Sequence, residues 1–161
     1  MMSYALFAFM MLNGILALCI RRHGKMLMLL SRLLLYPANF FLGAGIFMGA
    51  VWANVSWGRY WAWDPKEVWA LITFLVYGMA FHAKSLPAFR RPLFFHIYMI
   101  AAFLTVLMTY FGVNYYLSGL HSYGKSDAEL MPWPFVIGIV VMIVISVLAG
   151  YKYKKIKLTN E

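Results

Sequence analysis

The sequence predicts an all-α, polytopic membrane helix bundle of about five transmembrane helices, since each crossing takes about 20 residues. Hydrophobic residues make up 64% of the 161-residue chain and charged residues only 12%, with a mean hydropathy of +0.75. This composition excludes a water-soluble domain. The apolar stretches are long and do not alternate with polar residues, which excludes a transmembrane β-barrel. Backbone exposed to lipid must satisfy its hydrogen bonds within its own segment, so each stretch should be a helix.

Five apolar segments are long enough to cross a bilayer. They cover residues 3–20, 36–55, 65–83, 93–115 and 134–151. The connections between them are short, so we expect residues 1–161 to form a single transmembrane domain. The apolar residues 26–35 are too few to cross a bilayer and are followed by Pro37. This predicts a separate interfacial helix before the second span. Small residues predict close helix packing along the second span: Gly43, Ala44, Gly45, Gly49 and Ala50.

The basic residues predict the orientation. Eleven of the Lys and Arg residues lie in alternate connections, and only Arg59, Lys66 and Lys125 lie on the other side. The positive-inside rule therefore places the N-terminus outside and the C-terminus in the cytoplasm. The net charge of +9 is a topology signal and does not indicate nucleic-acid binding. The first span has its positive charges after the apolar run, so we expect it to be retained rather than cleaved.

Residues 57–69, between the second and third spans, concentrate aromatic and charged side chains. The segment reads WGRYWAWDPKEVW, and Trp52 comes just before it. Indole faces stack on flat ligands, while cationic groups and the free N–H groups of a helix start bind anionic edges. Tryptophan also populates interfacial belts, but belt residues are scattered around a bundle. We therefore predict a platform for a planar, anionic aromatic ligand. The residues expected to form it are Trp57, Arg59, Trp61, Trp63, Asp64, Lys66 and Trp69.

The same segment contains the signals of a helix start. Asp64 is placed as the N-cap, Pro65 in the first turn, and Glu67 three residues after the cap. The third span should therefore begin at Pro65. Capping alone would account for Asp64 and Glu67, so for Asp64 a capping role and a ligand-binding role both stay open.

Two histidines are candidate metal ligands, because imidazole binds iron through one ring nitrogen. His121 lies in the second outside connection, on the same side as the tryptophans. His82 closes the third span, roughly 27 Å from Asp64 along a helix. Taken singly, each would be a solvated or snorkelling histidine more often than a ligand. The sequence identifies no catalytic residue, and the single cysteine, Cys19, has no partner for a disulfide or CxxC motif.

These motifs resemble those of a known family. Residues 57–69 are similar to the tryptophan-rich WWD motif of the haem-handling membrane proteins of cytochrome c maturation. Residues 111–124, FGVNYYLSGLHSYG, resemble a segment of the CcsA (ResC) branch of that family. Together with GAVWAN at residues 49–54, the likeness covers nearly the whole chain.

The resemblance implies haem transport and presentation within a cytochrome c synthetase (haem lyase). Haem, a b-type haem bound non-covalently in transit, would enter through intramembrane histidines, to which His82 corresponds, and rest on the external platform between two histidines. His121 matches the second of these. The implied partners are a CcsB/ResB-like membrane protein and an apocytochrome c with CxxCH thiols. The implied location is the bacterial inner membrane or its equivalent.

One element of the family pattern is missing. The first external histidine of the family lies shortly before the stretch that matches residues 1–5, so this chain as written lacks it. We expect the chain to be the C-terminal part of a longer family pattern, a product with a late start codon, or a chain that receives this histidine from a separate polypeptide.

Two other classes of function remain open. An electron-transfer or quinone-linked membrane subunit with b-type haem would need histidine pairs on facing helices. A structural assembly factor without haem would use the tryptophans as belt and interface only. A soluble enzyme has no support, because no P-loop, dinucleotide fingerprint or nucleophile and base pair is present.

Overall fold

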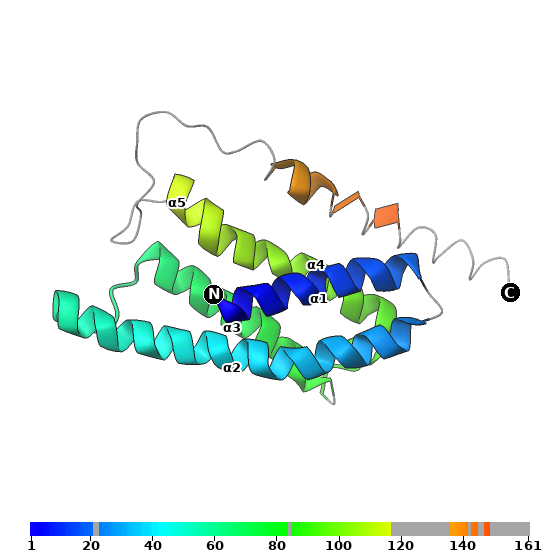
Figure 1. The fold of residues 1–161 in the computed structure, drawn as a ribbon, viewed down its shortest axis with the longest axis horizontal. Helices are drawn as coiled ribbons and strands as arrows, with labels where there is room; N and C mark the ends of the chain where they lie inside the picture. The colour runs from blue at the N-terminus through cyan, green and yellow to red at the C-terminus, as the bar shows by residue number, and fades with distance from the viewer. Residues whose placement is uncertain (21–22, 84, 117–135, 142, 145–146, 149–161) are drawn as a thin grey trace, which may run out of the picture.

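A computed structural model describes the chain over six ranges and shows it as a bundle of helices (Figure 1). The ranges are residues 1–20, 23–83, 85–116, 136–141, 143–144 and 147–148. Within them the chain forms helices and loops without a β-strand, which confirms the all-α prediction. The main elements are α1 (Met2–Cys19), α2 (Gly24–Trp57), α3 (Pro65–Met79), η2 (Ala80–His82), η3 (Pro87–Arg90), α4 (Pro92–Leu107), η4 (Met108–Gly112) and α5 (Val113–Tyr116).

The membrane character of the chain is confirmed by its helices. Among the described residues, three helical stretches are long and apolar enough to cross a bilayer: Met2–Cys19, Gly24–Trp57 and Pro92–Gly112. Their outward faces are also apolar, as expected where the surroundings are lipid. The fifth predicted span, residues 134–151, falls largely outside the described residues, with helix described only at 136–141, 143–144 and 147–148.

The core lies where α1 packs against α2, α3 and α4 (Figure 1). The ring of Phe7 in α1 stacks on that of Tyr77 in α3, with centroids 3.8 Å apart and planes 14° apart. Gly14 lets α1 approach α4 closely, because a Cβ atom there would lie 3.1 Å from the carbonyl oxygen of His96. Stacked rings and a small residue therefore bring α1 close to α3 and α4.

Helix α2 runs unbroken through Pro37, so the predicted separate helix before the second span is wrong. Proline removes one backbone hydrogen bond, but packed neighbours let membrane helices tolerate it. Leu35 and Ala38, on either side of the proline, are both buried in the core, and this packing holds the helix together across it. With 34 residues, α2 is about 51 Å long and exceeds the roughly 30 Å hydrocarbon thickness.

Helix α3 begins at Pro65, as predicted, and ends at Met79 in the short 3₁₀ helix η2. Together they rise about 28 Å, close to the thickness of a hydrocarbon core. Their length is therefore enough for the predicted third span.

The predicted fourth span is interrupted by a π-helical turn that the sequence analysis did not anticipate. Helix α4 gives way to η4, after which α5 resumes the α-helical path. Thr109, buried within η4, donates a hydrogen bond to the carbonyl oxygen of Thr105 at 2.7 Å. Its hydroxyl also lies 3.2 Å from that of Thr73 in α3. The irregular turn is thus tied to α3.

The small residues of α2 differ in their roles. A Cβ atom at Gly43 would lie 3.0 Å from the Phe74 ring, so this glycine allows α2 and α3 to pack closely, as predicted. A Cβ atom at Gly45 or Gly49 would meet no atom within 4 Å. The packing interpretation therefore applies to Gly43 and not to the other two.

Polar side chains cross-link the bundle at the end that holds Gly24, which we call the Gly24 end. The side-chain amide of Asn13 donates to the hydroxyl of Ser31 at 3.1 Å, joining α1 to α2. His96 Nε2 lies 2.9 Å from the carbonyl oxygen of Gly24. Arg32 donates from Nη2 to a backbone carbonyl of η3 at 2.7 Å. These contacts fix α1, α2, η3 and α4 to one another.

Candidate functional site

The α2–α3 loop, residues 58–64, lies at the opposite end of the bundle, which we call the tryptophan end. Helix α2 ends because Gly58 adopts a left-handed conformation, with φ of 71°, and its N–H donates to the carbonyl oxygen of Asn54 at 2.9 Å. Trp63 also has a positive φ, of 56°, and its side chain is 74% exposed. A left-handed residue with a side chain costs roughly 1–2 kcal/mol, so other contacts must hold the loop.

Glu67 supplies those contacts. One of its carboxylate oxygens accepts the N–H of Ala62 at 2.9 Å and the N–H of Asp64 at 3.1 Å. The two donors flank Trp63, so a single carboxylate fixes the backbone on both sides of the strained residue. Hydrogen bonds to a charged group contribute about 1.5–3 kcal/mol each, enough to offset the strain.

Asp64 caps α3, which confirms the predicted helix start. Its side-chain oxygen accepts the N–H of Lys66 at 3.1 Å, and with Glu67 it completes a capping box. Asp64 is only 4% exposed. The structure therefore assigns it a capping contact, and it does not line the pocket described next.

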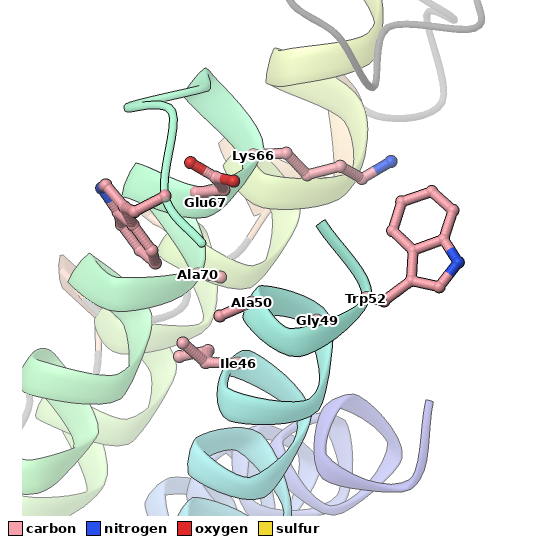
Figure 2. Close-up of a pocket in the computed structure, with 8 residues that line it drawn as sticks. Ile46, Gly49, Ala50, Trp52, Lys66, Glu67 and Ala70 are labelled. Carbon is pink, nitrogen blue, oxygen red and sulfur yellow. The ribbon is translucent and has the colours of Figure 1, made fainter. Parts of the chain in front are cut away.

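A pocket lies between the last turns of α2 and the first turns of α3 (Figure 2). Its volume is about 150 Å³, below the roughly 300–1,000 Å³ of pockets that enclose a small-molecule ligand. It therefore has room for the edge of a large planar molecule and not for the whole. It is lined by Ile46, Gly49, Ala50, Trp52, Trp61, Lys66, Glu67 and Ala70.

Two pairs of indoles surround this pocket. Trp52 contacts Trp57 edge to face, with ring centroids 5.0 Å apart and planes 79° apart. Trp61 contacts Trp63 in the same manner, at 5.9 Å and 87°. In each pair one member lines the pocket, Trp52 or Trp61, and the other supports it from the side. The aromatic platform therefore has two indoles at the pocket and two behind them.

Lys66 supplies a positive charge at the pocket. Its side chain is half-buried and reaches from α3 toward the indole of Trp52 on α2 (Figure 2). Its ammonium group lies 3.4 Å from the side-chain oxygen of Asn114 in α5, a long hydrogen bond. A cation favours a ligand with an anionic group. The pocket is also lined by Glu67, whose carboxylate accepts two backbone N–H groups of the α2–α3 loop.

The structure separates the sequence-predicted site residues into groups. Trp61 and Lys66 line the pocket, and Trp57 and Trp63 pack against its walls. Arg59 is exposed on the loop and does not line the pocket. Trp69 is half-buried in α3, away from the pocket lining, where its carbonyl oxygen accepts a hydrogen bond from Thr73.

Of the two predicted histidine ligands, only His82 lies in the described part of the chain. His82 is exposed at the end of η2, at the far end of α3 from the pocket. Along α3 and η2 it lies about 28 Å from Asp64, which is too far for it to contact a ligand in this pocket directly. His121 lies outside the described residues. Within the described ranges, no three His, Cys, Asp or Glu side chains gather to hold a metal ion.

Sequence reasoning missed Asn114 and the role of Gly49. Asn114 lies 48 positions from Lys66 in the sequence, and no local pattern links them. Gly49 was interpreted as a packing residue because small residues in membrane helices usually are. The GAVWAN stretch that contains both Gly49 and Trp52 was the available signal.

The fold and this pocket define an integral membrane protein with an aromatic, cation-bearing pocket at one end of its helices. The chain matches the family model described as cytochrome C assembly protein over residues 1–121. It therefore belongs to the cytochrome c assembly protein family.

Several curated proteins are similar to about half of the chain. Protein NrfI of Wolinella succinogenes is 51% identical over 83 residues, which cover 52% of this chain and 9% of that protein. The cytochrome c biogenesis protein CcsA of Picosynechococcus sp. is 51% identical over 85 residues, 52% of this chain and 24% of that protein. CcsA of Manihot esculenta is 48% identical over 87 residues, with shares of 53% and 26%. The matched part thus spans about a quarter or less of these relatives.

Proposed function

We propose that this chain carries haem in the membrane and presents it for attachment to apocytochrome c during cytochrome c assembly. One observation supports this most directly: Trp52, Trp61 and Lys66 line one pocket at the tryptophan end. Haem is a flat macrocycle with two carboxylates, so indole faces and a cation match its two chemical features. Membership of the cytochrome c assembly family agrees with this ligand.

The residues of the chain would bind and orient haem without enclosing it. The pocket takes one edge of the macrocycle, with a propionate at Lys66, and leaves the rest accessible. Aromatic stacking contributes about 0.5–1.5 kcal/mol per contact beyond burial, which suits a ligand that must be released. Bound haem supplies the vinyl groups that react with thiols, and the chain positions them.

The proposal extends to residues and partners suggested by the family resemblance. His121 would supply an axial nitrogen at the tryptophan end, and His82 would serve a separate intramembrane site near the cytoplasmic end. Residues 1–161 would form one transmembrane domain in the bacterial inner membrane or its equivalent, with the loop outside. A CcsB/ResB-like membrane protein and an apocytochrome c with CxxCH thiols would complete the synthetase.

The experiment is reconstitution of the full chain with haem in detergent, followed by a pyridine haemochrome spectrum. We expect stoichiometric b-type haem that is lost in His121→Gly and returns when imidazole is added. His23→Gly is the matched control, since His23 lies at the Gly24 end. Absence of haem from the wild-type chain would contradict the proposal. Unchanged haem content in His121→Gly would contradict the axial role of His121.

No observation favours the two other classes of function. An electron-transfer subunit would need a pair of histidines on facing helices, whereas His82 is exposed and His96 is engaged with the Gly24 carbonyl. A purely structural role does not explain why two tryptophans and a lysine line the same pocket.

A further inference from the structure

The contact between Lys66 and Asn114 has a specific structural origin. Among the described residues, two side-chain hydrogen bonds join α3 to the end of the α4–η4–α5 segment. They are Thr73 with Thr109 at 3.2 Å and Lys66 with Asn114 at 3.4 Å. On α3, Lys66 and Thr73 are seven positions apart, so they lie on one face of the helix within about 20°. On the η4–α5 segment, Thr109 and Asn114 are five positions apart, which in a regular α-helix would separate them by about 140° around the helix axis.

The π turn η4 removes this mismatch. Its hydrogen bonds join residues five apart, so it holds about one residue more than an α turn and brings such residues onto one face. Gly112, within the turn, leaves room for the side chain of Met108. Without the extra residue, Asn114 would be rotated by about 100° away from Lys66. Turns of this kind are frequent at functional sites.

We propose that Asn114 is a positioning residue that holds the Lys66 ammonium group at the pocket, ready for a carboxylate on the bound ligand. The inference rests on the proposed function and names a residue that the sequence motifs did not single out. A lysine side chain is a flexible four-carbon stem that samples many rotamers. A fixed acceptor restricts these rotamers before the ligand arrives, so less side-chain entropy is lost when the ligand binds. The amide oxygen is neutral, so it orients the ammonium group without cancelling its charge.

The test compares haem with haem dimethyl ester, in which both propionates are blocked. Affinities of the full chain in detergent are measured by the change in haem absorbance. The wild type should prefer haem over the ester, and Asn114→Leu should reduce this preference about tenfold by weakening haem alone. Asn114→Gln, which keeps an amide oxygen, should retain part of the preference.

Two controls separate positioning from a structural role. Asn39→Leu removes a buried amide in α2 that does not line the pocket, and should leave the preference unchanged. In a Lys66→Gln background, Asn114→Leu should have no further effect on the preference. A structural role would instead weaken haem and ester alike. If Asn114→Leu does not fold, Asn114→Ser, which withdraws the acceptor with a smaller change, replaces it.

The outcomes distinguish the inference from the function on which it rests. A wild-type chain that binds neither haem nor the ester overturns the proposed function and the inference with it. A chain that binds haem, but whose preference for haem over the ester is the same in Asn114→Leu, overturns the positioning role and leaves haem presentation standing.

Discussion

At the Gly24 end of the bundle, polar side chains are buried and join one helix to another, whereas at the tryptophan end they hold a loop and line an open pocket. Asn13 and Ser31 meet each other, and His96 meets the Gly24 carbonyl. At the tryptophan end, Glu67 accepts two hydrogen bonds from the backbone N–H groups of Ala62 and Asp64.

The difference shows how a small membrane bundle combines rigidity with a binding surface. In lipid there is little hydrophobic force between helices, so interhelical hydrogen bonds and close packing hold them together. Such bonds join α1, α2 and α4 at the Gly24 end, and α3 to α4 and η4 through Tyr98 and Thr109. At the tryptophan end, a long bond joins Lys66 to Asn114. There the side chain of Trp52, which lines the pocket, is 52% exposed.

The largest effect is expected at Glu67. Glu67→Ala removes the acceptor of two backbone N–H groups around Trp63, which should destabilise the loop by about 3 kcal/mol. Hydrogen exchange of the Ala62 and Asp64 amides should accelerate accordingly, while amides in α1 stay protected. Glu67→Gln, which keeps a carbonyl acceptor, is the matched control. Unchanged exchange at both amides in Glu67→Ala would mean that the loop is held by other contacts.

The next effect tests the Gly24 end. Arg32→Met loses the hydrogen bond to η3 and the placement of the guanidinium 5.4 Å from the Phe95 ring centre. Arg32 Nε is buried and has no hydrogen-bond partner among the described residues, so the substitution also removes an unsatisfied donor and recovers part of this loss. We expect the stability to fall by about 2 kcal/mol. Thermal unfolding in detergent measures it, with the exposed Arg91→Met as control. The haem affinity of Arg32→Met should equal that of the wild type. A fall in haem affinity alongside the fall in stability would mean that the two ends of the bundle are coupled.

A third prediction tests whether the pocket or the helix surface binds the ligand. Gly49→Leu places a side chain in the pocket and should weaken haem binding about tenfold, the equivalent of 1.4 kcal/mol. Gly45→Leu is matched to it, because both glycines lie in α2 with open space around them, but Gly45 does not line the pocket. Haem titration of the two variants measures the difference. Equal affinities would place the ligand elsewhere.

The smallest effect distinguishes the indoles that line the pocket from those behind them. Trp52→Leu should weaken haem binding about fivefold, since one stacking contact contributes about 1 kcal/mol. Trp63→Leu, at an exposed residue that does not line the pocket, should change it less. Haem titration again decides. Equal losses would support the sequence-based expectation that all the tryptophans form a single platform.

Much of the fold was accessible from sequence because its signals are local. Apolar length predicted α1, α2 and the α4 region, and the Asp64, Pro65 and Glu67 pattern placed the start of α3 at Pro65. Pro37 was misjudged because its effect depends on the helices packed beside it. The π turn was missed because it depends on contacts with α3.

The sequence by itself determined that the chain is an all-α membrane protein with tryptophans and a capped helix start in one loop, because hydropathy and capping depend on residues a few positions apart. Only the tertiary structure decided which of these side chains share a pocket. Trp61 and Lys66 line it with Trp52 and Gly49 from α2, whereas Arg59 does not. The direction in which a helix residue points depends on the rotation and register of whole helices, and these are set by packing between segments far apart in the chain.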